Sequence, residues 1–179
     1  MKTAIFLERD GILTVPVLAG SSQIAPVSLD QFKLNKQALP ALEALKAAGF
    51  VLIVTTNQPG ISNGLLPRRE LDRMHDALRR ALPVDDIFVC PHQQEDDCPC
   101  RKPEPGMFTE AAFKWHLNLE QSFVISDKWQ DARAARAVGC TSMMLQSPWI
   151  GSGHHDFVIP TLTAIADKIV RLHTGHLAA

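Results

Sequence analysis

The sequence lacks a long run of apolar residues and also lacks a block of like charges. Its 18 Lys and Arg residues are balanced by 19 Asp and Glu residues, which gives a formal net charge of −1 at pH 7. No apolar segment approaches the length of about 20 residues that a membrane-spanning helix needs. Without a basic patch, a surface for nucleic acid is not expected either. We therefore expect neither a membrane nor a nucleic acid as a partner.

No pattern of a signal or transit peptide opens the sequence, which begins with the strand-like stretch Met-Lys-Thr-Ala-Ile-Phe-Leu. We therefore expect a cytoplasmic protein. Cysteine is scarce, but three of the four cysteines lie between residues 90 and 100. In a reducing compartment such crowding favours a metal site over disulfides. The length of 179 residues and the 46% hydrophobic content fit one soluble globular domain over residues 1–179.

Short apolar segments rich in β-branched and aromatic residues alternate with amphipathic segments along the chain. Strands are predicted at residues 3–7, 50–55, 86–89, 122–125 and 141–145, and helices at 36–48, 67–82, 130–138 and 160–173, with a further helix beginning at 105. Residues 12–26, rich in Pro, Gly and Ser, are predicted to form a loop over the mouth of the first strand. This alternation indicates an α/β three-layer sandwich with a parallel, Rossmann-like sheet. The connections are too short for a large cap domain.

Polar residues follow the predicted strands where each of them ends. They are Glu8 and Asp10, Thr56 and Asn57, Ser126 and Asp127, joined by Arg101-Lys102 from a later loop. In open α/β sheets ligands bind beyond the carboxyl ends of the strands. Carboxylates that hold a divalent cation, with a hydroxyl and a lysine beside them, are what metal-assisted phosphoryl transfer needs. Taken singly, Thr56 is also compatible with a turn cap, Asp127 with a helix cap and Lys102 with a surface position.

These motifs resemble those of the haloacid dehalogenase-type phosphatase superfamily, and more closely its heptose-bisphosphate and histidinol-phosphate phosphatase branch. The resemblance covers about residues 3–147. It is carried by Ile5-Phe6-Leu7-Glu8-Arg9-Asp10-Gly11, by Val54-Thr55-Thr56-Asn57-Gln58-Pro59-Gly60-Ile61, by Cys90-Pro91-His92, by the run from Cys98 to Met107, and by Ser126-Asp127-Lys128-Trp129-Gln130-Asp131. The run Cys-Pro-Cys-Arg-Lys-Pro-Glu-Pro-Gly-Met is the most specific of these, because it joins a metal-binding loop to a phosphate-binding lysine.

The resemblance implies a Mg²⁺-dependent phosphatase that forms an aspartyl-phosphate-type intermediate on a small phosphate ester. The residue at position 8 would attack phosphorus, and Asp10 would serve as general acid and base. Mg²⁺ would lie between Glu8, the main chain of Asp10 and Asp127, while Thr56 and Lys102 would stabilise the phosphoryl group. Asn57, Gln58, Arg101 and Lys128 would bind the substrate. We expect a monomer or a weak homodimer.

The main departure from the family pattern is Glu8, because the family's nucleophile is aspartate. One additional methylene displaces the attacking oxygen by about 1 Å, and a misplacement of that size can cost about 10²-fold in rate. We therefore predict a phosphatase of impaired or altered turnover. The alternative is a non-catalytic, phosphate-binding or regulatory protein of the same fold. The branch usually has polar residues where this chain has the apolar stretch Pro16-Val17-Leu18-Ala19, and this difference argues against heptose bisphosphate as the substrate.

The cysteine-rich loop, residues 90–102, offers three thiolates and one imidazole from Cys90, His92, Cys98 and Cys100. This is the ligand set of a closed, structural zinc site. The alternative is a loop of reduced, unliganded thiols. Of the other candidates, Cys140 is expected in the core, and His75 is expected at the surface or half-buried. Trp129 and Trp149 fall near the predicted site, where ordinary packing is the interpretation we favour.

Overall fold

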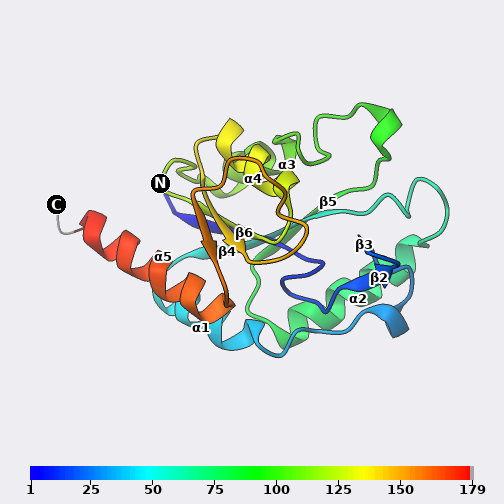
Figure 1. Ribbon diagram of the computed structural model, residues 1–179, viewed down its shortest axis with the longest axis horizontal. Coiled ribbons are helices and arrows are strands. Elements are labelled where there is room, and N and C mark those ends of the chain that lie inside the picture. The colour runs from blue at the N-terminus through cyan, green and yellow to red at the C-terminus, as the bar shows by residue number, and fades with distance from the viewer. Residues whose placement is uncertain (178–179) are drawn as a thin grey trace.

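The computed structural model describes residues 1–177, and a parallel sheet of six strands lies at its centre (Figure 1). Its strands, in spatial order, are β5 (Asp86–Cys90), β4 (Val51–Asn57), β1 (Ala4–Glu8), β6 (Phe123–Ser126), β7 (Thr141–Leu145) and β8 (Phe157–Ile159). In β1, Leu7 pairs with Val54 on one side and with Ile125 on the other. The carboxyl end of β1 therefore opens between those of β4 and β6.

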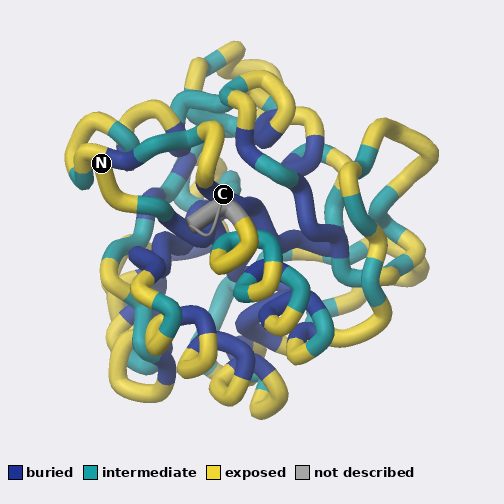
Figure 2. The backbone as a smooth tube through the Cα atoms, turned by 90° about the vertical axis from the view of Figure 1, so that its left-hand side faces the viewer, coloured by how far each residue is buried: buried dark blue, intermediate teal, exposed yellow. Residues whose placement is uncertain are grey.

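Helices cover both faces of the sheet, as the sequence predicted. On one face lie α1 (Ala38–Ala47), α2 (Arg68–Ala81) and α5 (Leu162–Leu177), and on the other lie α3 (Gly106–Trp115) and α4 (Trp129–Ala137) (Figure 1). Successive β1 residues alternate between the faces, so that Ile5 enters the first core and Phe6 enters the second. The four inner strands β4, β1, β6 and β7 are mostly buried, in keeping with the buried backbone at the centre of Figure 2. No helix within residues 1–177 is long and apolar enough to cross a membrane.

Several short elements of the structure were not predicted from the sequence. The predicted loop at 12–26 contains a small hairpin of β2 (Val17–Ala19) and β3 (Ser22–Ile24), which turns at Gly20 with φ +62°. Strand β8 lies in a stretch where no strand is predicted from the sequence. Each of these strands has three residues, which is too short for an alternating pattern to be recognised. Two 3₁₀ turns, η1 (Leu29–Gln31) and η2 (Gln94–Asp96), were also not predicted.

Helix α1 begins at Ala38, two residues after the predicted start, although Asn35 does accept a 3.1 Å hydrogen bond from the main chain of Gln37. The spacing of Leu39, Leu42 and Leu45 predicts that all three face inward, but Leu39 is 37% exposed. The buried stripe runs instead through Ala38, Ala41, Leu42 and Leu45, and small alanines are a weak signal for a core face. The prediction for Leu39 was wrong by one position on the helix.

The prediction that His75 lies at the surface or is half-buried is also wrong. Helix α2 buries His75 together with its predicted apolar residues Leu71, Met74 and Leu78, and the histidine is only 5% exposed. Its Nε2 lies 3.1 Å from the guanidinium of Arg9. Burial, followed by the charge of Arg9, lowers the pKa of His75 to about 3. His75 is therefore neutral in the folded protein at physiological pH.

This lowered pKa makes stability dependent on pH. Below pH 6.5 the unfolded chain binds a proton at His75, whereas the folded chain does not until about pH 3. The free energy of unfolding therefore falls as the pH drops, by about 2 kcal/mol between pH 7 and pH 5 from this residue. Denaturant unfolding of the wild type and of His75→Gln at both pH values checks this, because the variant should lack the contribution. Parallel pH profiles of the two proteins would contradict the burial of a neutral His75.

Candidate active site

The buried ammonium of Lys102 lies at the centre of the site. This side chain is 2% exposed as a residue, and its Nζ donates to Glu8 Oε2, to Asp131 Oδ1 at 2.6 Å and to the carbonyl of Thr55 at 3.0 Å. Burial alone would lower the pKa of Lys102, but the charges of Asp131 and Glu8 raise it above its ordinary value. A charged lysine is thus held at the carboxyl ends of β1 and β4.

Asn57, the last residue of β4, fixes the main chain of Lys102. Its Nδ2 donates to the Lys102 carbonyl at 3.0 Å, and the Lys102 N–H donates back to Asn57 Oδ1 at 3.2 Å. The end of β4 thereby sets where the lysine leaves its loop. The role of Asn57 in binding substrate stays a prediction, because Lys102 engages both ends of its amide.

Glu8 is folded back onto its own turn. Its Oε1 accepts the main-chain N–H of Arg9 at 3.0 Å and that of Asp10 at 3.2 Å, while Oε2 accepts from Lys102. Burial opposes ionisation, but the charge of Lys102 and then that of Lys128 lower the pKa of Glu8 to about 2. Glu8 is therefore an ionised carboxylate, and both of its oxygens are hydrogen-bonded within the protein.

Four donors hold the carboxylate of Asp10. Arg9 donates from Nε to Oδ1 at 2.9 Å and from Nη2 to Oδ2 at 3.0 Å, in a bidentate contact. Gln58 Nε2 adds a bond to Oδ2 at 2.8 Å, and Thr14 Oγ1 adds one to Oδ1 at 3.3 Å. Arg9 is fully buried. Neither Arg9 nor Thr14 was predicted to belong to the site, because nothing in their spacing distinguishes them from turn residues.

Thr56 and Gln58 lie beneath this carboxylate and are both fully buried. Gln58 Nε2 donates to Thr56 Oγ1 at 2.8 Å as well as to Asp10, while Gln58 Oε1 has no partner. The structure thus brings both residues to the predicted site, at its inner wall. Their contacts with a phosphoryl group or a substrate remain predictions.

Two of the predicted magnesium ligands, the main-chain carbonyl of Asp10 and the carboxylate of Asp127, both contact the ammonium of Lys128. Lys128 Nζ donates to the main-chain carbonyl of Asp10 and, at 2.9 Å, to Asp127 Oδ1. Burial opposes the charged form, but the charges of Glu8 and then Asp127 raise the pKa of Lys128. These oxygen donors are of the kind that a hard divalent cation prefers. The ammonium acts as a stand-in for such a cation, so the residues fit Mg²⁺.

A hollow of about 330 Å³ opens above these groups. Its lining includes Glu8, Asp10, Gln23, Ile24, Ala25, Asn57, Pro59, Arg101, Lys128, Gln130 and Asp131. Gly11, at φ +101°, lies where a Cβ would collide with the side chains of both Asp127 and Gln23. The side-chain amide of Gln23 is buried, and neither of its polar atoms has a hydrogen-bond partner. The β2–β3 hairpin thus places an unpaired amide against the hollow.

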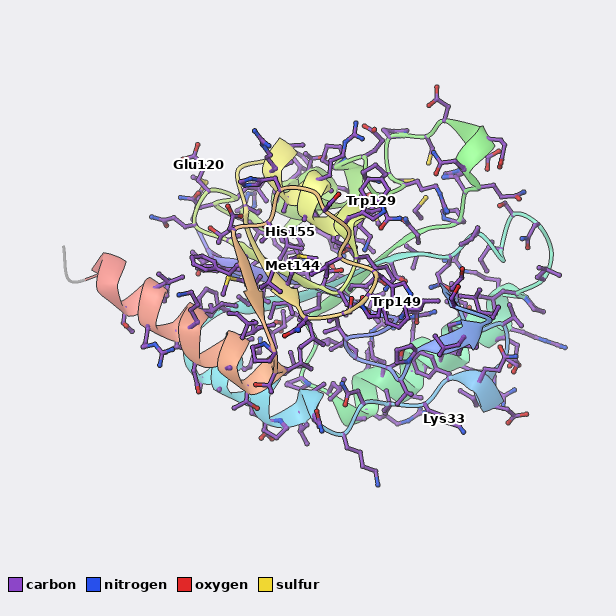
Figure 3. All side chains as sticks on the ribbon, viewed as in Figure 1. Lys33, Glu120, Trp129, Met144, Trp149 and His155 are labelled. Carbon is purple, nitrogen blue, oxygen red and sulfur yellow. The ribbon has the colours of Figure 1, made fainter. Side chains whose placement is uncertain are left out.

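The hairpin is linked to the loop that follows β7. Trp149 Nε1 donates to the carbonyl of Ser21 at 3.3 Å, and the Trp149 carbonyl accepts from the main chain of Trp129 at 3.3 Å. Figure 3 labels both tryptophans. Both tryptophans border a second hollow that shares Gln23 with the first. Trp129 is 41% exposed. Trp129 and Trp149 therefore line a hollow beside the candidate site, which goes beyond the ordinary packing role expected for them.

The cysteine-rich loop brings its four predicted ligands together. The ligand atoms of Cys90, His92, Cys98 and Cys100 all lie within 4.8 Å of one another, and four of their separations are 3.3–3.6 Å. A tetrahedral zinc ion with bonds of about 2.0–2.3 Å has ligand–ligand separations of about 3.3–3.8 Å. The arrangement therefore fits a closed zinc site.

This loop also carries the other basic residue of the predicted site. Arg101 Nη1 donates to the carbonyl of His92 at 2.8 Å, and its Nε lies 3.4 Å from Gln94 Oε1. The guanidinium thereby stays on the loop and lines the hollow. The cluster, Arg101 and Lys102 form one continuous segment, so the position of the loop determines the position of both cations.

Known proteins share both the sequence and this architecture. A family model described as HAD-hydrolase-like matches residues 99–164. D-glycero-β-D-manno-heptose-1,7-bisphosphate 7-phosphatase of Bordetella bronchiseptica is 33% identical over 148 residues, which cover 80% of each chain. The histidine biosynthesis bifunctional protein HisB of Legionella pneumophila is 33% identical over 144 residues, or 78% of this chain and 40% of that protein.

A solved structure agrees with these relatives. The crystal structure of D,D-heptose 1,7-bisphosphate phosphatase from B. bronchiseptica, complexed with magnesium and phosphate, is 30% identical and superposes with a TM-score of 0.83. The alignment covers 96% of this chain and 99% of that one. The resemblance inferred from the motifs is thereby confirmed: the chain belongs to the haloacid dehalogenase-like hydrolase family.

Proposed function

We propose that this chain is a Mg²⁺-dependent phosphomonoester hydrolase that acts on a small phosphorylated metabolite. The observation that carries the proposal is the buried Lys102 ammonium, which lies among carboxylates from β1 and α4 at the open end of the sheet. The similar phosphatases support a substrate of the sugar-bisphosphate or histidinol-phosphate type. The apolar residues Ile24, Ala25 and Pro59 also line the hollow.

In the proposed reaction the carboxylate at position 8 attacks phosphorus and forms an acyl-phosphate. Asp10 protonates the leaving oxygen and then takes a proton from the water that hydrolyses the intermediate. Lys102 and Thr56 stabilise the equatorial oxygens of the phosphoryl group as their charge changes. Arg101, on the rim of the hollow, orients the leaving group.

Glu8, Asp127 and the main-chain carbonyl of Asp10 would hold the magnesium ion. The bound ion would reduce the repulsion between the attacking carboxylate and the phosphate dianion. Its binding requires Lys128 to leave the oxygens of Asp10 and Asp127. That side chain is 22% exposed, so it has a route towards the hollow, where it can contact substrate.

Glu8 is the reason to expect slow turnover. In its present conformation each carboxylate oxygen accepts hydrogen bonds, Oε1 from two main-chain N–H groups and Oε2 from Lys102. Attack on phosphorus needs one of these oxygens to be released and aligned. The shorter side chain of aspartate would place its carboxylate about 1 Å or more from those partners, towards a bound phosphoryl group.

A second candidate function, a non-catalytic phosphate-binding protein, is favoured by the same contacts. Consecutive main-chain N–H groups that converge on one point form an anion-binding site. Here they converge on Glu8 Oε1, beside the Lys102 ammonium. These are the donors that a phosphoryl group would use, so Glu8 competes with any phosphate ligand.

Replacing Glu8 by Asp should raise the rate of phosphate release at least tenfold, because it restores the position of the attacking oxygen. The assay uses a panel of sugar phosphates, sugar bisphosphates and histidinol phosphate. It compares both proteins with Mg²⁺ and with a chelator, and activity should require Mg²⁺. Asp10→Asn in each background is the inactive control. Equal rates for the two proteins would show that position 8 does not supply the nucleophile.

Replacing Glu8 by Ala should strengthen the binding of inorganic phosphate in the absence of divalent metal, by about tenfold or more, because it frees the main-chain N–H groups and Lys102. Isothermal titration calorimetry with chelator present measures this. The matched control is Glu104→Ala on the loop after Lys102, which should leave binding unchanged. Weaker binding by the Glu8 variant would contradict the competition.

The cysteine cluster should hold one zinc ion per chain, measurable by elemental analysis of the purified protein. Replacing Cys98 and Cys100 by Ser should abolish the zinc content and lower the melting temperature, because metal binding contributes folding free energy. Replacing Cys140, a buried core cysteine outside the cluster, by Ser should leave the zinc content unchanged. If the wild type contains no zinc and has the same melting temperature as the Cys98/Cys100 variant, the thiols of the loop are unliganded.

A further inference from the structure

The fully buried guanidinium of Arg9 links the core of the protein to Asp10. Two of its nitrogens donate to the two oxygens of Asp10, and Nη1 lies 3.1 Å from His75 Nε2. Its Cζ lies 5.2 Å from the centroid of the Phe32 ring, on the side of the sheet covered by α2. Arg9 is thus anchored from one side by the carboxylate and from the other by His75 and Phe32.

The contact with Arg9 defines the state of His75. A guanidinium has no acceptor, so His75 Nε2 must accept this hydrogen bond. The imidazole is therefore neutral, with its proton on Nδ1, in agreement with the pKa that burial and Arg9 lower to about 3. A histidine with this tautomer presents a fixed acceptor to Arg9.

We propose that His75 is a positioning residue for the reaction, which acts through Arg9 on the carboxylate of Asp10. The inference rests on the proposed function, in which Asp10 is the general acid and base. Arg9 has a long side chain with many rotamers. The hydrogen bond that Arg9 Nη1 donates to His75 selects the rotamer that presents Nε and Nη2 to both Asp10 oxygens. General acid–base catalysis depends on that geometry.

An ordinary core role for His75 predicts a different outcome. If the imidazole only filled space, leucine would replace it with a modest change in stability and no specific effect on turnover. If it positions Arg9, leucine leaves Nη1 as a buried charged donor without a partner. Arg9 would then turn towards another acceptor and release one or both of its bonds to Asp10.

The test compares His75→Leu with His75→Gln, whose side-chain oxygen can still accept from Arg9. Both are made in the wild type and in the faster Glu8→Asp background. We expect His75→Leu to lower kcat about tenfold with KM changed less than about twofold, since the loss affects the reacting proton and not substrate binding. His75→Gln should keep kcat within about threefold of its parent.

His173→Leu is the matched control for loss of a partly buried histidine. His173 packs against Phe50, with the two ring centroids 4.6 Å apart, and lines a hollow at the amino ends of β6 and β7, away from Asp10. This variant should lose stability without losing kcat. The proposal is overturned if folded His75→Leu keeps its parent's kcat, or if His75→Gln is impaired as much as His75→Leu.

A spectroscopic measurement separates this proposal from the proposed function. Nitrogen-15 NMR of the full chain should show His75 as the neutral Nδ1–H tautomer, and a slowly exchanging Nε–H signal of Arg9. That Arg9 signal should broaden in His75→Leu and persist in His75→Gln. If no variant hydrolyses phosphate esters but these signals behave as stated, the proposed function fails and the positioning of Arg9 stands. A protonated or Nε2–H imidazole overturns the positioning of Arg9 by His75 regardless of activity.

Discussion

The buried ammonium of Lys102 is the constraint on which the rest of the site depends. A cation that is removed from water is tolerated only where opposite charges and hydrogen bonds replace its hydration. Glu8, Asp131 and the Thr55 carbonyl provide that replacement, each from a different place in the chain. Because Lys102 belongs to a loop, its position must also be fixed along the main chain. Asn57 does this from the end of β4, through two hydrogen bonds to the main chain of Lys102.

The other buried charges follow from the same requirement. Arg9 is paired with Asp10, and Lys128 is paired with Asp127. Four carboxylates, including Glu8 and Asp131, thus face three cationic side chains. A divalent cation and a phosphate dianion leave this balance unchanged only when both bind. Electrostatics would therefore couple the binding of these two ligands. In their absence the positive charge of Lys128 occupies the proposed place of the cation, and the negative charge of Glu8 occupies that of the phosphate.

Sequence reasoning pointed to the candidate site because its signals are local. Strands that end in polar residues pointed to Glu8, Asp10 and Asp127, and the spacing of the cysteines pointed to the Cys/His cluster that could hold a metal ion. The contacts of His75 and Arg9 were not predictable. Each is a polar residue whose burial depends on a partner 66 positions away, and no periodic pattern encodes such a pair. The β2–β3 hairpin was missed for another reason, since its three-residue strands carry no alternating pattern, although the loop was expected at the mouth of β1.

The two candidate functions reduce to one physical question at position 8. The additional methylene of Glu8 does more than displace an attacking oxygen, because it also lets the carboxylate reach the N–H groups of its own turn. Those N–H groups and Lys102 would otherwise be available to a phosphoryl group. In the proposed reaction, a substrate would therefore have to displace Glu8, the residue that attacks it. The carboxylate of Glu8 and a phosphoryl group compete for the same hydrogen-bond donors. Whether the protein hydrolyses a phosphate ester or only binds it depends on how completely the ligand and its metal ion displace Glu8 from these donors.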